Sequence, residues 1–418
     1  MSGKPAPEPR RILFLGPVGV LGGAERVLLD AVRALRAERP SVALKVITMT
    51  PGPLLDAVRT AGGEAELIEM PGALAELGDS GAGSRALGVA RQLGQVAASP
   101  EVYRFHEALR RTIRAFAPDL LHSNGLKTHL LSPSLVGRSM PIVWHLHDFV
   151  SQRPLMRRGL AAVNGRASLG LAISQAVADD CASALGPLPL AVVHNAVDCV
   201  RFSPGPGDGA WLDGLAGLPP APAGTVRIGL VATYARWKGH EVFLRTAARV
   251  LAREPRLPVR FYLVGGPIYR TLDSQFAREE LTELSRALGL EGRVGFVAFQ
   301  EDTVPIYRAL DVAVHASTSP EPFGLTIVEA MACGRPVVVS LAGGARELVR
   351  PGTDALSAPP GDVRALSEQL LLLARDAALR ARLASAAREV ALARFSREHW
   401  GAKLLQAYAL AGRAPAAP

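Results

Sequence analysis

Apolar residues along the chain form short runs, and each run is followed by a segment with helical period. Two representative runs are ILFL at 12–15 and VRIGLV at 226–231. Others are LKVITM, DLLHSN, IVWHLH, LGLAIS, LAVVHN, RFYLVGG, RVGFVAF, VAVHAS and PVVVS. Near-continuous apolar strands that alternate with amphipathic helices indicate parallel sheets covered on both faces. The pattern therefore predicts doubly wound α/β domains with ligands at the carboxyl ends of the strands.

The two halves of the chain begin alike, each with a strand, a glycine-containing turn and a helix. The first copy is RRILFLGPVGVLGGAERVLL and the second is VRIGLVATYARWKGHEVFL, and a Pro- and Gly-rich stretch separates the two halves. We predict a Rossmann-like domain at 1–202, a linker at 203–225, a second Rossmann-like domain at 226–385 and a C-terminal helix and tail at 386–418. A cleft between two such domains is the natural active site. We also expect a mobile loop and helix at 71–100.

Composition narrows the class of protein. The chain has 418 residues, 49% of them hydrophobic and 20% charged, which is typical of globular domains. Its three cysteines lack metal-like spacing, and its first ten residues are polar, so we expect a cytoplasmic protein without a signal peptide or membrane span. The net charge of +9 suits phosphorylated substrates or an anionic membrane surface, or reflects compositional bias. No nucleic-acid-binding signature accompanies it.

Glycines and basic residues mark two candidate phosphate sites. Gly22 and Gly23 follow the first strand, where backbone N–H groups and a helix N-terminus favour a phosphate. The stretch is not GxGxxG, which disfavours a nicotinamide enzyme, and an ordinary tight loop is the alternative. In RWKG, Lys238 is a candidate partner for a diphosphate. Arg236 is a candidate second cation that would assist it. The alternative there is a solvated basic turn.

The strand end WHLHD supplies a candidate histidine. Strand alternation places His145 and His147 on one face and Asp148 on the other. Two histidines at this spacing can chelate a metal, but no further ligands of matching pattern appear nearby, so we expect no metal. We favour His147 as a strand-end group that acts on a sugar hydroxyl or phosphate.

The stretch EPFGLTIVE places two carboxylates around a turn. Glu321 lies in the turn and Glu329 lies inside the following helix. A diphosphate at the helix N-terminus would leave Glu329 for the vicinal hydroxyls of a ribose and Glu321 for a sugar. The alternative is a capping acid and an ordinary surface glutamate.

Taken in order, these motifs resemble a known family. The chain is similar to the retaining glycosyltransferases of the GT-B fold, which has two Rossmann-like domains, and specifically to glycosyltransferase family 4, group 1. The similarity covers nearly the whole chain. It includes GGAE, WHLHDF, LAISQAVADD, VVHNAVDCVRFSP, RWKGHEVFL, YLVGGP, FQEDTVPIYRALDVAVHAS, EPFGLTIVEAMACGRPVV and LAGGARELV. The resemblance implies an acceptor-binding first domain, a nucleotide-sugar-binding second domain facing it across a cleft, and a C-terminal helix that crosses back to the first domain.

The resemblance also implies a role for each candidate residue. Catalytic roles fall to His147 on the donor sugar, Lys238 on the diphosphate and Glu321 beside the transferred sugar. Substrate-binding roles fall to Gly22, Gly23, Arg236, Gly265, Phe323, Gly324, Leu325 and Glu329. Gly265 borders the base, Glu329 holds the ribose, and the backbone of residues 323–325 binds sugar or phosphate.

One departure from the family pattern concerns the diphosphate. The family usually carries an arginine where this chain has Thr233, and Arg236 is a hypothetical substitute. A second departure is Asn195-Ala196-Val197-Asp198, which has alanine in place of a turn glycine. We expect neither change to abolish activity.

The resemblance implies transfer of a hexose, with retention, from a UDP-, GDP- or ADP-linked sugar to a glycan, lipid-linked or other cell-envelope acceptor. It implies no cofactor and no metal. Arg153, Arg157 and Arg158 allow peripheral association with an anionic membrane, a grip on a phosphorylated acceptor, or merely a solvated helix face. The alternatives to the transferase are a sugar-nucleotide 2-epimerase of the same fold and a catalytically silent binding subunit.

Overall fold

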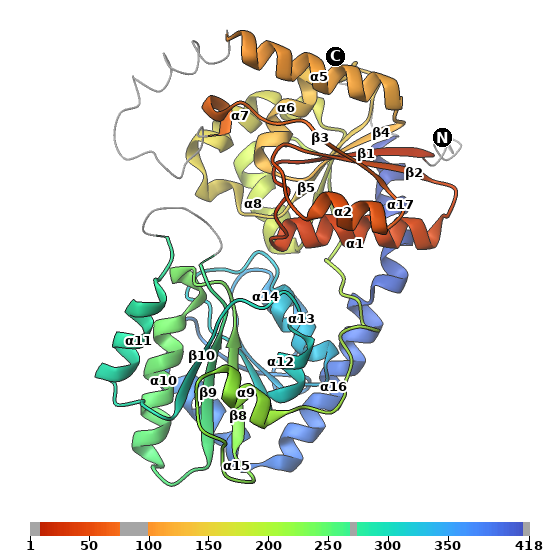
Figure 1. Cartoon of the computed structure of the whole chain (residues 1–418). Coiled ribbons are helices and arrows are strands. Elements are labelled where there is room, and N and C mark those ends of the chain that lie inside the picture. The colour runs from red at the N-terminus through yellow and green to blue at the C-terminus, as the bar shows by residue number, and fades with distance from the viewer. Residues whose placement is uncertain (1–8, 76–98, 268–273, 413–418) are drawn as a thin grey trace. The chain divides into compact units, whose positions relative to one another are not determined.

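The structure, a computed structural model, describes residues 9–75, 99–267 and 274–412 (Figure 1). The chain divides into two compact units. The first consists of Met1–Ala196 with Arg397–Pro418, and the second consists of Val197–Ser396. Most of the predicted loop at 71–100 lies outside the described residues. No helix in the described ranges is long and apolar enough to cross a membrane.

Within its described residues, the first unit has a seven-stranded parallel sheet in the order β3-β2-β1-β4-β5-β6-β7. The strands are β1 (Arg11–Gly16), β2 (Ala43–Thr48), β3 (Glu64–Leu67), β4 (Leu120–Ser123), β5 (Ile142–Leu146), β6 (Leu169–Ala172) and β7 (Leu190–Val192). The order reverses direction between β1 and β4, which makes their carboxyl ends the topological switch point.

The helices of the first unit connect these strands. They are α1 (Gly23–Glu38), α2 (Leu54–Thr60), α3 (Gly72–Ala75), α5 (Pro100–Phe116), α6 (Leu126–Leu135), α7 (Pro154–Val163), α8 (Gln175–Leu185) and α17 (Trp400–Ala411), with short turns η2 (Val150–Gln152), η3 (Asn164–Arg166) and η5 (Arg397–His399). The C-terminal helix α17 packs on α1, so the chain returns to the first unit as predicted. Gly401 permits this contact, since a Cβ there would lie 2.5 Å from the carbonyl oxygen of Ala34.

The second unit has a six-stranded parallel sheet, again counted over its described residues, in the order β10-β9-β8-β11-β12-β13. The strands are β8 (Val226–Val231), β9 (Val259–Val264), β10 (Val294–Val297), β11 (Val312–His315), β12 (Val337–Ser340) and β13 (Leu356–Ala358). The helical elements are α9 (Gly209–Leu215), η4 (Arg236–Lys238), α10 (His240–Arg253), α11 (Arg278–Ala287), α12 (Val304–Ala309), α13 (Leu325–Ala332), α14 (Ala345–Leu348), α15 (Val363–Arg375) and α16 (Ala377–Phe395). Two parallel, doubly wound units confirm the predicted fold class.

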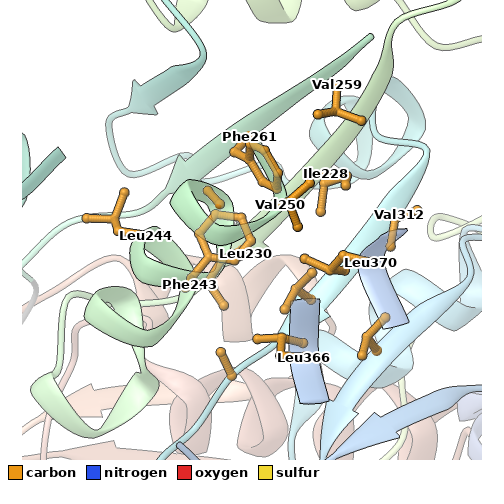
Figure 2. Packing of buried hydrophobic residues seen from close by; sticks show 14 of the residues in the cluster. Ile228, Leu230, Phe243, Leu244, Val250, Val259, Phe261, Val312, Leu366 and Leu370 are labelled. Carbon is orange, nitrogen blue, oxygen red and sulfur yellow. The ribbon is translucent and has the colours of Figure 1, made fainter. Parts of the chain in front are cut away.

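Side chains of each central strand divide between the two faces of the second sheet. Phe261 and Leu263 of β9 join the large core under α10 and α15 (Figure 2), whereas Tyr262 and Val264 face a smaller cluster with α9 and α12. Successive side chains on a strand point to opposite faces, so a strand buried on both sides is apolar throughout. This explains the uninterrupted apolar runs in the sequence.

The Pro- and Gly-rich segment 203–225 contains a helix that is fixed to the second unit. On this helix, α9, the fully buried carboxylate of Asp213 accepts hydrogen bonds from Tyr262 and from Arg227, the latter at 2.8 Å. Arg260 lies 3.0 Å from the same carboxylate. A buried carboxylate is tolerated when cations and hydrogen-bond donors surround it. Asp213 therefore fastens the segment to β8 and β9.

We predict that Asp213→Asn lowers the free energy of unfolding by about 3 kcal/mol, because it leaves two partly buried arginines without their counter-charge. Urea unfolding followed by tryptophan fluorescence measures the change. Asp302→Asn is the control, since its ion pair with Arg201 is exposed and such pairs contribute about 1 kcal/mol or less. Equal effects of the two substitutions would contradict the anchoring role of Asp213.

Candidate active site

The candidate residues of the second unit lie in the two loops at its switch point. The loop after β8 carries Lys238, and the loop after β11 carries Glu321. Because β8 and β11 are neighbours in the sheet, and the helices that follow them lie on opposite faces in a doubly wound fold, their carboxyl ends border a crevice. Residues far apart in the sequence therefore meet at this edge.

Lys238 and Glu321 form a close ion pair. The ammonium Nζ of Lys238 lies 2.9 Å from Oε1 and 2.7 Å from Oε2 of Glu321. The hydroxyl of Ser317 donates to Oε2 at 3.0 Å, and Nε2 of His315 lies 3.0 Å from the same oxygen. The carboxylate is only 6% exposed. Three polar groups thus fix one buried carboxylate.

The surroundings of Glu321 keep it ionised. Burial by itself raises the pKa of a carboxyl group, but the charge of Lys238 and the hydrogen bond from His315 outweigh it and hold the pKa of Glu321 well below its usual range. Glu321 is therefore a carboxylate at neutral pH. It accepts hydrogen bonds and does not act as a proton donor.

A close approach between two loops positions Lys238. Gly239 has a φ of 80°, and a Cβ at this residue would lie 1.9 Å from the carbonyl oxygen of Ala316. Beside this contact, the N–H of Thr318 donates to the carbonyl of Trp237 at 2.8 Å. The Lys238 ammonium also lies 3.9 Å from the centroid of the Trp237 ring, which is cation–π geometry. Only glycine permits this approach.

The loop after β12 positions Glu321. The N–H of Glu321 donates to the carbonyl of Ala342 at 3.2 Å, and the N–H of Gly344 donates to the carbonyl of Glu321 at 2.7 Å. Gly343 lies between these bonds with a φ of 62°, and a Cβ there would lie 2.4 Å from the carbonyl oxygen of Glu321. The glycine pair in LAGGARELV therefore holds the catalytic candidate in place.

His315, Ser317 and Gly343 were not predicted as site residues, although all three lie in the motifs VAVHAS and LAGGARELV. His315 and Ser317 alternate at the end of an apolar strand, so both side chains lie on the same face. That alternation of polar residues in VAVHAS was the available signal. Gly343 could be found only by knowing which backbone it approaches.

The helix after Glu321 carries the remaining EPFGLTIVE residues. Gly324 has a φ of 108° and directly precedes α13, whose first residue is Leu325, while the Phe323 ring is buried against Phe395. The first N–H groups of a helix have no partner within the helix and attract anions. Glu329 lies one turn further along α13, where its Oε2 accepts a hydrogen bond from the hydroxyl of Tyr307 at 2.9 Å.

Arg236 lies in the same loop as Lys238, and Gly265 lies after the neighbouring strand β9. The guanidinium of Arg236 pairs with Glu280 at 2.9 Å and lies 4.4 Å from the centroid of the Phe276 ring. Gly265 directly follows β9 with a φ of 150°, and a Cβ there would lie 1.9 Å from the carbonyl oxygen of Ala232. The structure thus brings Lys238 to Glu321 and places Arg236 on a neighbouring acid.

In the first unit, Gly22 and Gly23 begin α1, as the sequence predicts. Gly22 is the N-cap residue, and a Cβ at Gly23 would meet no atom within 4 Å. Glu25 follows in the first turn and is buried. Burial raises the pKa of Glu25 to about 7; the negative charge of Asp148 adds to the rise, and the N–H groups of Glu25 and Gly22 oppose it.

His147 is joined to the first turn of α1 through Asn124. Its Nε2 lies 2.8 Å from Oδ1 of Asn124, whose Nδ2 donates to the carbonyl of Ala24 at 3.1 Å. Burial lowers the pKa of His147 to about 3, so the imidazole is neutral. Asn124 was not among the predicted site residues. Over the described ranges, no three His, Cys, Asp or Glu side chains gather in a way that could hold a metal ion.

Two family models match the two halves of the chain. The model described as "Glycosyltransferase Family 4" matches residues 21–201, and the model described as "Glycosyl transferases group 1" matches residues 225–376. Only the two ends of the chain and the segment 202–224 remain unmatched. The chain belongs to glycosyltransferase family 4, group 1. The predicted membership of glycosyltransferase family 4, group 1, is therefore confirmed.

The chain is also similar to solved structures and to curated relatives. Anabaena Alr3699/HepE has a TM-score of 0.76 and 29% identity, covers 94% of this chain with 98% of its own, and was solved with UDP and glucose. A second HepE structure contains UDP-glucose. The D-inositol 3-phosphate glycosyltransferases of Rhodococcus erythropolis and Rhodococcus opacus are 38% and 34% identical over 41% and 54% of this chain. These matches span 37% and 49% of the relatives' own lengths.

The fold match to HepE covers nearly the whole chain. Because HepE aligns along 94% of the residues, its fold matches that of each unit. The predicted GT-B fold is therefore confirmed.

We predict that Glu25→Gln changes stability in a pH-dependent way. The folded-state pKa of about 7 lies above the ordinary value of 4.5, so the native state binds more protons than the unfolded state between these values. The contribution of Glu25 to stability is therefore lost as pH rises through 7, and the variant gains about 2 kcal/mol over the wild type between pH 5 and pH 8.

Denaturant unfolding at several pH values tests this prediction. Glu38→Gln, an exposed substitution on the same helix, serves as the control. A constant difference between Glu25→Gln and wild type across this range would show that Glu25 is ionised throughout.

Proposed function

We propose that the chain transfers a hexose, with retention of configuration and without a metal, from a nucleotide-sugar donor to a glycan, lipid-linked or other cell-envelope acceptor. Family membership supports glycosyl transfer in general. The complexes of HepE with UDP and UDP-glucose support a UDP-linked sugar over a GDP- or ADP-linked sugar.

The observation that carries this proposal is the Lys238–Glu321 pair at the switch point of the second unit. A lysine ammonium neutralises phosphate oxygens, and the adjoining N-terminus of α13 adds unpaired N–H groups. A carboxylate that stays ionised suits the hydroxyl groups of a sugar. The lysine and the helix N-terminus suit the diphosphate, and the carboxylate suits the hydroxyl groups of the sugar.

We assign the remaining residues by the same chemistry. Glu329 accepts hydrogen bonds from ribose hydroxyls, and the backbone of residues 323–325 contacts sugar or phosphate. Gly265 borders the base. Arg236 supplies a second cation, for which it must leave its ion pair with Glu280. In the first unit, Gly22 and Gly23 lie beside the donor phosphates and the acceptor, and His147 contacts the hydroxyls of the donor sugar. His147 is neutral, so it serves as a hydrogen-bonding group.

The proposed reaction breaks the bond between the sugar C1 and the diphosphate oxygen, and the bonding electrons leave on that oxygen. Lys238 and the N–H groups at α13 stabilise the charge that develops there. The acceptor hydroxyl oxygen then bonds to C1 from the same face, which retains configuration. Its proton passes to the departing diphosphate oxygen. The cation that this step needs is supplied by Lys238, so we propose that no metal is required.

We predict that Lys238→Ala and Glu321→Gln each lower kcat/KM for sugar transfer about 100-fold, because each removes a group that contacts charge or hydroxyls in the transition state. Radiolabelled UDP-, GDP- and ADP-sugars with membrane-extracted acceptors measure transfer, and UDP-induced thermal shifts measure nucleotide binding. Arg245→Ala and Glu241→Gln are matched controls, since they break an exposed ion pair of the same unit.

Each alternative function gives a different result in this experiment. A 2-epimerase would convert the nucleotide-sugar to its epimer without any acceptor. A silent binding subunit would perform no transfer, and both substitutions would leave its cellular role intact. Loss of activity in EDTA that Mg²⁺ restores would contradict the metal-independent mechanism.

For the acceptor side, we propose that α7 contacts an anionic membrane surface. The helix exposes Arg157 and Arg158, and Arg153 directly precedes it. Leu155 beside them is 38% exposed. An exposed apolar residue among cations is typical of a segment that lies on the lipid headgroups.

We predict that the double variant Arg157→Glu, Arg158→Glu loses most of its binding to phosphatidylglycerol vesicles at low salt, because each cation near the surface contributes about 1 kcal/mol. Vesicle sedimentation measures the bound fraction. The double variant Arg364→Glu, Arg382→Glu changes net charge equally at exposed positions of the second unit and should bind like wild type. Equal losses in both would mean that only net charge matters.

A further inference from the structure

Three buried polar side chains form a row inside the first unit. Tyr408 lies on α17, His122 on β4 and His145 on β5, and all three are essentially inaccessible to water. The hydroxyl of Tyr408 lies 2.9 Å from Nδ1 of His122. Nε2 of His122 lies 3.2 Å from Nδ1 of His145. The row therefore links the C-terminal helix to two central strands.

Hydrogen bonding within this row couples the tautomers of the two imidazoles, so that one sets the other. Burial lowers the pKa of His122 to about 3 and that of His145 well below its usual range, so both rings are neutral. A neutral imidazole has one donor and one acceptor nitrogen. If Tyr408 donates to Nδ1 of His122, Nε2 of that ring must donate to His145. The far nitrogen of His145 then carries a proton.

The end of the row contacts the candidate site. The rings of His145 and His147 are adjacent, with centroids 4.1 Å apart. On its other side, His147 is bonded to Asn124. Nε2 of His145 is buried and has no hydrogen-bond partner among the described residues. His147 is thus held by one hydrogen bond and by the ring of His145.

Stability alone explains this row poorly. Burying a polar group costs free energy that its hydrogen bond only roughly offsets, and an apolar side chain of the same shape is often as stabilising. Here one nitrogen is left without a partner, which adds to the cost. Polar networks of this kind do, however, specify one arrangement of side chains.

We propose that Tyr408, acting through His122 and His145, is a positioning residue for His147. The row fixes the orientation of the His145 ring, and that ring is the surface against which His147 packs. Through it, the C-terminal helix that crosses back to the first unit sets the geometry of a sugar-contacting group. This inference rests on the proposed role of His147 in sugar transfer.

The test compares Tyr408→Phe with wild type. This substitution removes one hydroxyl and keeps the ring that packs edge-on against His122. We expect kcat to fall about tenfold, since small displacements of a positioned group have effects of this order, and the KM for UDP-glucose to stay within about twofold. Tyr103→Phe, on the exposed face of α5, is the matched control and should match wild type.

Imidazole ¹⁵N NMR provides a readout that does not depend on activity. We expect Tyr408→Phe to shift the tautomer signals of His122 and His145 and to displace the His147 signal. His122→Phe should lower kcat likewise. His122→Gln, whose amide can still bond to His145, should recover part of it. If Tyr408→Phe is too unstable to study, the difference in kcat between His122→Phe and His122→Gln tests the inference instead.

Wild-type kcat together with an unchanged His147 signal in Tyr408→Phe would overturn the inference. So would a loss of kcat that His122→Gln shares fully with His122→Phe. A wild-type protein that transfers no sugar would instead refute the proposed function. In that case an unchanged His147 signal would still refute the coupling to Tyr408.

Discussion

A carboxylate buried at the end of a sheet constrains much of the second unit. Glu321 is removed from water, and a buried carboxylate without a cation would take up a proton. Lys238 prevents this by placing its ammonium against both oxygens. Because the two residues come from separate loops, the loops must meet, and the sheet order that makes β8 and β11 neighbours is what lets them meet.

Two glycines make that meeting sterically possible. Gly239 allows the lysine loop to touch the backbone of Ala316, and Gly343 allows the loop after β12 to bond on both sides of Glu321. Each has a positive φ, where other residues are strained, and in each case a Cβ would overlap a carbonyl oxygen. The site geometry is therefore set by backbone contacts that leave little freedom to the two charged side chains.

The sequence predicted the central strands and helices well, because a strand buried on both faces is apolar at every position. The edge strands β3 and β13 were not named: β3 is EAEL, with two charged residues, and β13 has three residues. The site was predicted by motif as far as Lys238 and Glu321. Asn124 was missed because its bond to His147 depends on β4 and β5 being neighbours, and strand order cannot be deduced from periodicity. His315 and Ser317 contact Glu321 from the end of the same strand, where alternating polar residues were the only sequence signal.

The buried polar groups at the candidate site differ in charge between the two units. The second unit keeps a charged pair, which suits a diphosphate that must be neutralised. In the first unit the histidines near the candidate site are neutral, since burial lowers their pKa values and no acid bonds to them in the hydrogen-bond row. Neutral imidazoles and an amide recognise hydroxyl groups by direction rather than by charge. If the first unit binds sugar hydroxyls, its specificity depends on how His147 is oriented, and a buried row that orients the adjacent His145 ring has a physical reason to exist.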